Sequence, residues 1–335
     1  MRYKLDKLKN YYYYIRKKHI LETYPMQVCI ELTNHCNLKC VMCPHQRMTR
    51  QKGFMTKDMF VRIIDEIKGK TEFIYLYGMG ESLLHPHFFE MAGYAVKNGI
   101  KTSFSTNITL LSEDNSRRLL ESGIDFVVLA LDGTNKETYE KIRVNSHFEK
   151  NIEQTKRFLT LKKRLGSRTY VDLQFILMDI NRKDVPKIKS LFTEEERSAI
   201  NAYRIKPVYI SPSVNNEQVS HRHPCYLLWN TMTIAWDGRV PLCCMDFDAQ
   251  MVVGDSNKQG IYDIWNDKAL ARIRAMHKEL KYDNLQICSK CNLPEMGYFS
   301  APTILANIVF GAATLRKLMP FFEKVFINRE KRLQL

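Results

Sequence analysis

The sequence predicts an α/β fold, a partial (β/α)6 barrel followed by a small, cysteine-rich C-terminal domain. Apolar runs alternate with amphipathic segments six times between residues 28 and 210, which favours parallel strands joined by right-handed crossovers. Three cysteines follow the first apolar run, and four more are spread over residues 225–291. A chain of 335 residues is long enough for one large domain and a smaller one.

The strand–helix units follow from apolar periodicity and from the residues that begin or end helices. We expect strands at residues 28–32, 73–77, 102–106, 126–131, 171–177 and 203–210. We expect helices at residues 56–67, 87–97, 113–122, 136–142, 149–165 and 184–192. Thr56 is a suitable N-cap for the first helix, and Gly99 and Gly123 follow the ends of two others. In such barrels the active site lies at the carboxyl ends of the strands.

Four units make up the expected domain organisation. Residues 1–24 form a basic, Tyr-rich lead helix, which covers residues 5–21. The core barrel, the auxiliary domain and a basic amphipathic tail follow, at residues 25–215, 216–300 and 301–335.

The auxiliary domain begins after a linker that is rich in Pro, Ser, Asn and His. Trp236-Asp237-Gly238-Arg239 separates apolar runs at 231–235 and 240–243, and this pattern predicts a β-hairpin. Two helices are expected after the hairpin, at residues 261–265 and 268–280.

The net charge of +15 is concentrated at the two ends of the chain. Residues 1–20 hold seven Lys and Arg against one Asp, and residues 301–335 hold six against two Glu. A basic excess is typical of contact with nucleic acid, an anionic membrane or an acidic substrate, and also of a solvated basic face. Since no nucleic-acid-binding motif accompanies it, we expect no nucleic-acid partner. Contact of the basic termini with an anionic membrane stays open, because the apolar runs of the tail are shorter than a membrane span.

The nine cysteines are odd in number and occur in short motifs, unlike the disulfide framework of a secreted protein. The N-terminus also lacks the apolar core of a signal peptide. We therefore expect a cytoplasmic protein with reduced thiols, whose contact with a membrane, if any, is peripheral.

The segment after the first expected strand contains Cys36, Cys40 and Cys43 in a CxxxCxxC arrangement. Three thiolates from one loop can hold three irons of a [4Fe–4S] cluster, which leaves the fourth iron open to a small molecule. A zinc site or a reactive-thiol loop is the alternative interpretation. The position of the loop behind a strand, with four suitably spaced cysteines downstream, favours the cluster.

These residues resemble the radical S-adenosylmethionine (SAM) superfamily, in which a CxxxCxxC loop follows the first barrel strand. The bulky residue that precedes the last cysteine in that family is Met42 here. The resemblance implies that the open iron chelates SAM and that an external donor of the flavodoxin or ferredoxin type supplies an electron. SAM is then cleaved to a 5′-deoxyadenosyl radical, which abstracts a hydrogen atom from the substrate. The cofactors carry this chemistry, and the protein positions and shields them.

The same resemblance assigns SAM-binding residues to other strand ends. The segment with Gly78, Gly80 and Glu81 is similar to the Gly-Gly-Glu motif that holds the SAM amino group, although Met79 stands where the first of the paired glycines often sits. Ser105 and Asn107 stand where polar groups of the family face the SAM ribose. An ordinary strand-to-helix turn is the structural alternative for residues 78–81.

The fourth expected strand ends in Ala-Leu-Asp-Gly, which resembles the Ser-Leu-Asp-Gly segment of the family. Ala130 replaces the serine, so one hydrogen bond expected near SAM is missing, and Asp132 is carried over as a SAM-site residue. Arg143 suits a bidentate pair with the SAM carboxylate, and equally a surface salt bridge.

A second set of cysteines resembles the ligands of the SPASM and shorter twitch extensions of radical SAM enzymes, namely Cys225, Cys243, Cys288 and Cys291. The spacing is close to the one-cluster form in aminoglycoside-pathway alcohol dehydrogenases. Four ligands imply a second [4Fe–4S] cluster without an open iron, and a zinc ribbon is the alternative. Cys29 is expected to be a buried, inert thiol. Cys244 is either structural or a catalytic residue that donates a hydrogen atom to a substrate radical.

The resemblance as a whole implies an oxidoreductase-type radical SAM enzyme that acts on a sugar- or polyol-type small molecule. The auxiliary cluster would accept the second electron. This substrate preference rests on cluster spacing and on family analogy. The alternatives are a peptide-maturing SPASM enzyme, a redox-neutral epimerase that uses Cys244, and a non-catalytic Fe–S or zinc protein.

Overall fold

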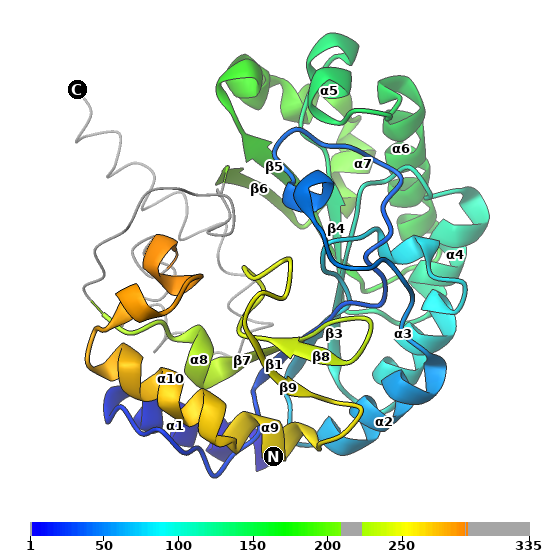
Figure 1. The fold of residues 1–335 in the computed structure, drawn as a ribbon. Helices are drawn as coiled ribbons and strands as arrows, with labels where there is room; N and C mark the ends of the chain where they lie inside the picture. Colours follow the sequence, from blue (N-terminus) through cyan, green and yellow to red (C-terminus); the bar gives the residue numbers. More distant parts are fainter. Residues whose placement is uncertain (1, 209–222, 292, 294–335) are drawn as a thin grey trace.

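Seven parallel strands form one curved sheet at the centre of the molecule (Figure 1). The computed structural model describes residues 2–208, 223–291 and 293. The order of the strands is β6-β5-β4-β3-β2-β1-β7. Their bounds are β1 Gln27–Ile30, β2 Phe73–Tyr75, β3 Lys101–Thr106, β4 Phe126–Ala130, β5 Tyr170–Leu177, β6 Ala202–Pro207 and β7 Thr231–Ile234. The first six follow one another across the sheet as the sequence predicts, so the partial-barrel class is confirmed.

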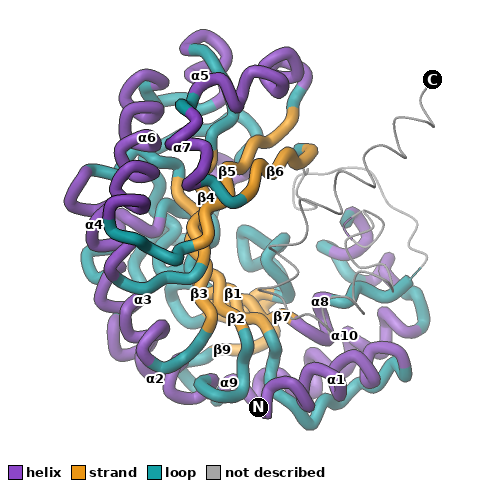
Figure 2. The backbone as a smooth tube through the Cα atoms, turned by 180° about the vertical axis from the view of Figure 1, so that it is seen from behind, coloured by secondary structure: helices purple, strands orange, loops and turns teal. Residues whose placement is uncertain are grey.

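Helices lie outside the curved sheet and cover its convex face (Figure 2). The helices between the strands are α2 Lys57–Ile67, α3 Phe88–Lys97, α4 Glu113–Glu121, α5 Lys136–Ile142, α6 Phe148–Arg164 and α7 Glu194–Ala199. Thr56 caps α2, since its side chain accepts a hydrogen bond from the backbone N–H of Met59. The expected helix start at residue 56 is therefore right.

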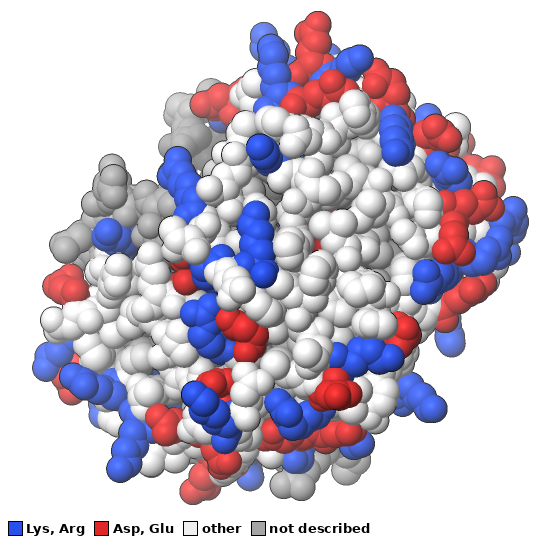
Figure 3. Space-filling view, turned by 45° about the vertical axis from the view of Figure 1, so that its right-hand side comes forward, with Lys and Arg blue, Asp and Glu red and all other residues white. Residues whose placement is uncertain are grey.

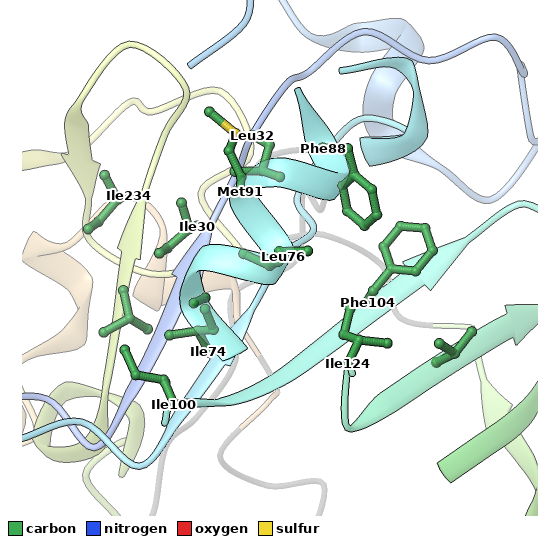
Figure 4. Packing of buried hydrophobic residues seen from close by; sticks show 14 of the residues in the cluster. Ile30, Leu32, Ile74, Leu76, Phe88, Met91, Ile100, Phe104, Ile124 and Ile234 are labelled. Atoms are coloured by element: carbon green, nitrogen blue, oxygen red, sulfur yellow. The ribbon is translucent and has the colours of Figure 1, made fainter. Parts of the chain in front are cut away.

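The helix-facing side of the sheet builds the main apolar core (Figure 4). Phe88 of α3 and Phe104 of β3 point toward each other, with ring centroids 4.7 Å apart. Successive side chains of a strand alternate between faces, so every second strand residue joins this core. Examples from the strands and the residues that follow them are Ile30, Leu32, Ile74 and Leu76.

The concave face of the sheet has a different composition. A small cluster of Phe73, Phe126, Tyr170 and Ala202 fills its N-terminal end, because these residues begin their strands. Toward the carboxyl ends the alternate positions are polar, for example Ser105. The concave face is therefore closed by aromatic rings at one end and presents polar groups at the other.

The auxiliary segment departs from the expected hairpin. The Trp-Asp-Gly-Arg turn is present, because the N–H of Ala235 donates to the carbonyl of Arg239 at 2.9 Å. However, β7 pairs in parallel with β1, whereas β8 (Arg239–Pro241) pairs antiparallel with β9 (Val252–Asp255). The expected pairing of residues 231–235 with 240–243 is therefore wrong. Without β7, this edge of β1 would expose unpaired backbone N–H and C=O groups, and β7 pairs with these groups.

Three further boundaries differ from expectation. Helix α1 covers Arg2–Ile15 and not 5–21, since Lys17 adopts a left-handed backbone conformation with φ of 52°. The segment expected as a helix at 184–192 belongs to a 3-10 helix, Asp179–Leu191, in which Pro186 lacks a backbone donor. The last residues of the sixth expected strand and the expected tail at 301–335 lie outside the described residues.

Helices α9 (Ile261–Asn266) and α10 (Lys268–Lys278) end within two residues of the expected bounds. None of the described helices has the length and apolar content needed to cross a lipid bilayer. On the face seen in Figure 3, Lys and Arg are interspersed with Asp and Glu around the rim.

Helix α1 is fixed to the rest of the protein by buried contacts. The ammonium of Lys7 lies 2.7 Å from the carboxylate of Glu72, and both side chains are less than 10% exposed. Burial lowers the pKa of Lys7, and the charge of Glu72 opposes this effect. Tyr14 donates a hydrogen bond to the carbonyl of Pro224, and its ring packs edge-on against Trp229. The lead helix therefore links the second strand to the auxiliary domain.

We expect Glu72→Gln to destabilise the protein by about 3 kcal/mol, because the buried ammonium of Lys7 loses its anionic partner. Replacing both residues by methionine should restore most of this loss. Asp65→Asn, which breaks the exposed pair with Lys68, is the control and should have a much smaller effect. Urea unfolding under anaerobic conditions measures the differences, and equal losses for Glu72→Gln and Asp65→Asn would contradict the prediction.

Candidate active site and cluster-binding residues

The loop with the first three cysteines leaves the carboxyl end of β1 (blue in Figure 1). The side chain of Asn34 orders this loop: its Nδ2 donates to the carbonyl of Gln51, and its Oδ1 accepts from the N–H of Gly53, both at 2.9 Å. A ring nitrogen of His45 makes a 2.8 Å hydrogen bond with the Asn34 carbonyl. These hydrogen bonds thus join the start of the loop to its later residues, with the cysteines between them.

Two polar side chains approach the sulfurs of this loop, one from the residue after β3 and one from the residue after α5. Asn107 Nδ2 lies 3.9 Å from Cys36 Sγ, and Arg143 Nη1 lies 3.6 Å from Cys40 Sγ. Burial raises the pKa of all three thiols, that of Cys36 to about 11, and the charges of neighbouring cysteines contribute to the shifts of Cys36 and Cys43. Gathered, desolvated thiols ionise only beside a cation, and soft sulfur ligands suit an iron–sulfur cluster. Cys36, Cys40 and Cys43 therefore fit a cluster held by three protein ligands.

The turn after β2 packs directly on the cysteine loop. The N–H of Glu81 donates to the carbonyl of His35 at 2.8 Å. A Cβ atom at Gly80 would collide with the backbone oxygens of Thr33 and His35, and one at Gly78 would collide with the side chain of Glu31. Glycine is required at both positions by this close approach.

Glu81 is buried beside the loop and is 2% exposed. Its carboxylate accepts hydrogen bonds from the N–H groups of Asn107 at 2.7 Å and Leu83 at 3.3 Å. Desolvation raises the pKa of Glu81 to about 7. Ser105 lies on the same face of β3 as Asn107 and is partly exposed. The structure thus brings Glu81 and Asn107 together, whereas Ser105 is placed only by its position on β3. The bond to Leu83 also caps the following 3-10 helix.

Arg143 pairs with Asp132, which follows the end of β4. Nε and Nη2 of Arg143 lie 2.6 Å and 2.5 Å from one oxygen of Asp132, and the other oxygen accepts the N–H of Ile176 at 2.6 Å. The Asp132 side chain is 0% exposed and that of Arg143 is 9% exposed. The alternative of a surface salt bridge for Arg143 is therefore wrong, because the helix before it folds the guanidinium inward over the strand end.

A second buried ion pair was not anticipated from the sequence. Arg50 contacts both carboxylate oxygens of Glu31, at 2.7 Å and 2.5 Å, and its Nε donates to the carbonyl of Phe247 at 2.7 Å. The carboxylate of Asp248 accepts the N–H groups of Thr49 and Arg50, at 2.7 Å and 3.0 Å. These contacts join the first cysteine loop to the segment after Cys243. The available sequence signal was Glu31, a charged residue within the otherwise apolar run at residues 28–32.

The other four predicted ligands line one small cavity with largely apolar walls. Cys225, Cys243, Cys288 and Cys291 come from separate stretches of the chain and meet there beside Leu228, Leu242 and Ile287. Burial raises the pKa of Cys225 to about 12, and it raises the pKa of Cys243 and Cys288 strongly; nearby cysteines add to each shift. A set of four desolvated sulfurs fits a fully ligated cluster.

His277 lies in the same cavity, and sequence reasoning missed it. The N–H of Cys225 donates to its Nδ1 at 3.3 Å, so the ring proton is on Nε2, which donates to Cys288 Sγ at 3.4 Å. His277 follows Ile273 by four residues on the buried face of α10, and this spacing was the available signal. Among the described residues, no group of three or more His, Cys, Asp or Glu is arranged to hold a single metal ion.

Cys29 and Cys244 lie near each other between these two sites. Cys29 is on the concave side of β1, and its register partner on β7 is Thr233. Burial raises the pKa of both thiols, that of Cys29 to about 12, and the charge of Cys29 contributes to the shift of Cys244. Cys244 is therefore placed toward the concave face of the sheet as well as beside a predicted ligand.

Residues 30–190 match the family model of the radical SAM superfamily, and residues 225–292 match SPASM, an iron-sulfur cluster-binding domain. The two domains imply [4Fe–4S] clusters and SAM as cofactors. A tungsten-containing aldehyde ferredoxin oxidoreductase cofactor-modifying protein of Pyrococcus furiosus is 29% identical over 164 residues, which are 48% of this chain and 46% of that relative. The chain spans less than half the length of this relative and of two other curated relatives that it matches.

Two crystal structures share the fold at low sequence identity. Streptococcus suis SuiB bound to precursor peptide SuiA has a TM-score of 0.63 and 15% identity, over 88% of this chain and 77% of that one. BtrN in complex with AdoMet and 2-DOIA has a TM-score of 0.56 and 16% identity, over 80% of this chain and 92% of that one. With both family models matched, the chain belongs to the radical SAM superfamily and carries a C-terminal SPASM iron–sulfur cluster-binding domain.

Proposed function

We propose that this radical SAM enzyme abstracts a hydrogen atom from an unactivated C–H bond of a sugar- or polyol-type substrate and oxidises the resulting radical. The observation that carries the proposal is the difference between the two cysteine sets. Three cysteines gather at the carboxyl ends of the strands, and four gather in a separate, largely apolar cavity. Three ligands leave one iron for SAM, whereas four leave none, so the second site suits electron transfer.

The proposed roles of the chain's residues follow from their positions. When bound, the clusters and SAM supply the cleavage of SAM, the hydrogen abstraction and the acceptance of the second electron. Gly78 and Gly80 let the turn after β2 pack against Glu31 and the cysteine loop, which places the turn beside SAM, and Glu81 receives the ammonium group of SAM. Ser105 and Asn107 bind the ribose. The ligands of the two clusters are Cys36, Cys40 and Cys43, and Cys225, Cys243, Cys288 and Cys291.

Asp132 orients Arg143 in this proposal. The carboxylate of Asp132 holds two nitrogens of the guanidinium, so Arg143 is a rigid cation beside Cys40. We assign to it the carboxylate of SAM, since a preorganised guanidinium suits a planar anion. An external electron donor of the flavodoxin or ferredoxin type supplies the first electron.

The choice of substrate class depends on the second cysteine set. The set of four cysteines, with one auxiliary cluster, favours a small polyol or sugar over a peptide. A peptide-maturing enzyme is the alternative, and SuiB bound to its precursor peptide shares this fold. A fold is compatible with many substrates, so the likeness does not transfer that substrate to this chain.

Iron content tests the two cluster assignments. Anaerobically reconstituted protein is expected to hold about eight irons per chain, as two [4Fe–4S] clusters. Replacing Cys36, Cys40 and Cys43 by alanine should leave about four and abolish the release of 5′-deoxyadenosine from SAM after reduction. Iron and zinc are measured by mass spectrometry on the same samples. A colourless, zinc-loaded protein would contradict both cluster assignments.

Redox-neutral epimerisation is the second candidate reaction, and the position of Cys244 favours it. The thiol lies near Cys29 on the concave side of β1, where a substrate between the strand ends is within reach. In this reaction the thiol of Cys244 returns a hydrogen atom to the opposite face of the substrate, and the product has the mass of the substrate. In the oxidative reaction the product has lost two hydrogens. In the redox-neutral reaction the auxiliary cluster would serve structure or substrate positioning. We favour oxidation, because four protein ligands leave no iron for a substrate and therefore suit electron transfer.

Cys244→Ala separates the two reactions once a substrate is known. Under oxidation, the variant should keep turnover and a product two hydrogens lighter than the substrate. Cys29→Ala is the matched control, since it removes a neighbouring thiol that is not adjacent to a ligand. Product mass and 5′-deoxyadenosine are measured together. If the wild-type product has unchanged mass and Cys244→Ala makes 5′-deoxyadenosine without product, oxidation is the wrong choice.

The lead helix is the proposed contact with an anionic membrane. Leu5, Leu8, Tyr12 and Ile15 are 52–63% exposed and recur at helical spacing along α1. Lys9 and Arg16 are exposed on the same side, and residues 7–21 contain no carboxylate. An apolar stripe flanked by cations suits the interface of an anionic bilayer.

Leu8→Glu combined with Ile15→Glu should weaken binding to vesicles that contain anionic phosphatidylglycerol by about tenfold, because two buried apolar contacts are replaced by charges. Leu165→Glu with Ile180→Glu is the matched control: it adds the same charge at exposed apolar positions outside α1. Co-sedimentation at low salt measures binding. The proposal fails if wild-type protein does not sediment with the vesicles, or if both double variants sediment as well as wild type.

A further inference from the structure

One polar side chain other than those of the cysteines lines the cavity of the second cysteine set, within the described part of the chain. It belongs to His277, which is 1% exposed, and the other lining side chains are those of leucine, isoleucine and methionine. Because water is largely excluded from such a cavity, a polar group in it has a large electrostatic effect. His277 is therefore the residue of this cavity, apart from the cysteines, that can influence the charge of a bound cluster.

The orientation of the imidazole is fixed by contacts at both of its nitrogens. The backbone N–H of Cys225 donates to Nδ1 at 3.3 Å, so the proton of the neutral ring is on Nε2. Nε2 lies 3.4 Å from Cys288 Sγ and donates to it. The ring of Tyr282 packs edge-on against the imidazole, with centroids 4.6 Å apart. One histidine therefore contacts two of the four predicted ligands and is held in place by an aromatic neighbour.

Helix α10 fixes His277 relative to the segment that begins at Cys225. Arg274, which is one turn earlier on the helix, is 0% exposed, and its Nε donates to the carbonyl of Leu228 at 2.8 Å. Nη1 of Arg274 donates to the carbonyl of His19 at 3.0 Å, so the residues after α1 hold the helix as well. The imidazole is thus directed at Cys288 by the fold of the auxiliary domain.

A donor on a ligand sulfur favours the reduced state of an iron–sulfur cluster. Reduction adds one electron, and hydrogen bonds to the sulfurs are among the factors that set the reduction potential, because they stabilise the added negative charge. The effect is larger where the local dielectric is low. Burial and nearby cysteines raise the pKa of Cys288 strongly, which reflects the same cost of negative charge in this cavity. The hydrogen bond from His277 opposes this cost.

We propose that the hydrogen bond from His277 to Cys288 raises the reduction potential of the auxiliary cluster, so that the cluster accepts the electron of the substrate radical. In this step the substrate radical loses one electron to the cluster and one proton to solvent, which gives a product two hydrogens lighter than the substrate. His277 acts through Cys288 and is therefore a positioning residue. The inference rests on the proposed function and deepens it, because it assigns a residue to the transfer of the second electron.

Two amide variants separate the contacts of the two ring nitrogens. The amide of glutamine reaches the position of Nε2 and can donate to Cys288, whereas the shorter asparagine reaches only the position of Nδ1. His277→Asn should make reduction of the auxiliary cluster about tenfold less favourable, a shift of about −59 mV for a one-electron couple. His277→Gln should keep most of the wild-type potential. A redox titration of anaerobically reconstituted protein, followed by electron paramagnetic resonance, measures the potential; the signal that persists without Cys36, Cys40 and Cys43 belongs to the auxiliary cluster.

Ile273→Val is the matched control for these variants. Ile273 is buried one turn before His277 on α10, so the variant loses packing of the same helix without changing a polar contact, and it should keep the wild-type potential. Equal potentials for wild type and His277→Asn would overturn the proposal, and so would an equal shift in His277→Gln or Ile273→Val. Loss of the auxiliary cluster from His277→Asn, measured as about four irons per chain, would assign the contact to cluster binding and would also overturn it.

Iron content and 5′-deoxyadenosine separate failure of this role from failure of the proposed function. Wild-type protein that holds zinc, or only about four irons, would contradict the auxiliary cluster and with it both the proposed function and this inference. About eight irons, normal release of 5′-deoxyadenosine and an unchanged potential in His277→Asn would overturn the role of His277 alone. Once a substrate is known, His277→Asn should release 5′-deoxyadenosine as wild type does but form less of the oxidised product.

Discussion

The buried ion pair between Glu31 and Arg50 determines how the two cysteine-bearing parts of the chain meet. Glu31 follows β1, and its carboxylate binds both the guanidinium of Arg50 and the N–H of Met79. Arg50 in turn donates to the carbonyl of Phe247, three residues after Cys244. A buried pair of this kind contributes little net stability, because desolvation offsets the attraction, whereas loss of one partner is costly. We infer that its main effect is to fix the geometry between the two sites.

Several local features follow from this pair. Gly78 has no side chain because that of Glu31 occupies the space. Asp248 orders the backbone at Arg50, so the guanidinium reaches β1 from a defined direction. The ladder between β7 and β1 adds a second connection, since β7 is followed closely by the stretch that contains Cys243. Two independent contacts to β1 therefore hold the auxiliary cavity beside the cysteine loop.

Local patterns were enough to predict the barrel and the cysteine sets. The apolar alternation in residues 28–177 and caps such as Thr56 depend on neighbours in sequence, so the first six strands and most helices were placed within a few residues. The position of β7 was not predictable, because a Trp-Asp-Gly turn favours a hairpin and only the free edge of β1 changes the outcome. A 3-10 helix around Pro186 replaces the expected α-helix, and the reason is local, because proline has no backbone N–H to donate within a helix.

The contacts of the site residues were harder to foresee than their identity. The sequence placed Asp132 and Arg143 in one site, but their mutual pairing depends on how the helix after β4 folds back over the strand end. His277 accepts the N–H of Cys225, 52 residues earlier, and Arg50 donates to the carbonyl of Phe247, 197 residues later, so no motif spacing includes either contact. Long-range polar contacts of this kind depend on the assembled sheet, and they became visible only in the structure.

The curvature of the sheet brings its two edges, β6 and β7, toward a common concave face. In a flat sheet with this strand order, β6 and β7 would lie about 29 Å apart, too far for one small substrate to approach both. The observed sheet is curved, and its concave face carries Arg204 at one edge and Cys29, close to Cys244, near the other (Figure 1). Aromatic side chains fill the N-terminal end of this face, so a substrate is confined to the end where the cysteine loop lies. A small substrate on this face would therefore lie between the first cysteine loop and the auxiliary domain, which is the geometry that oxidation of a substrate radical requires.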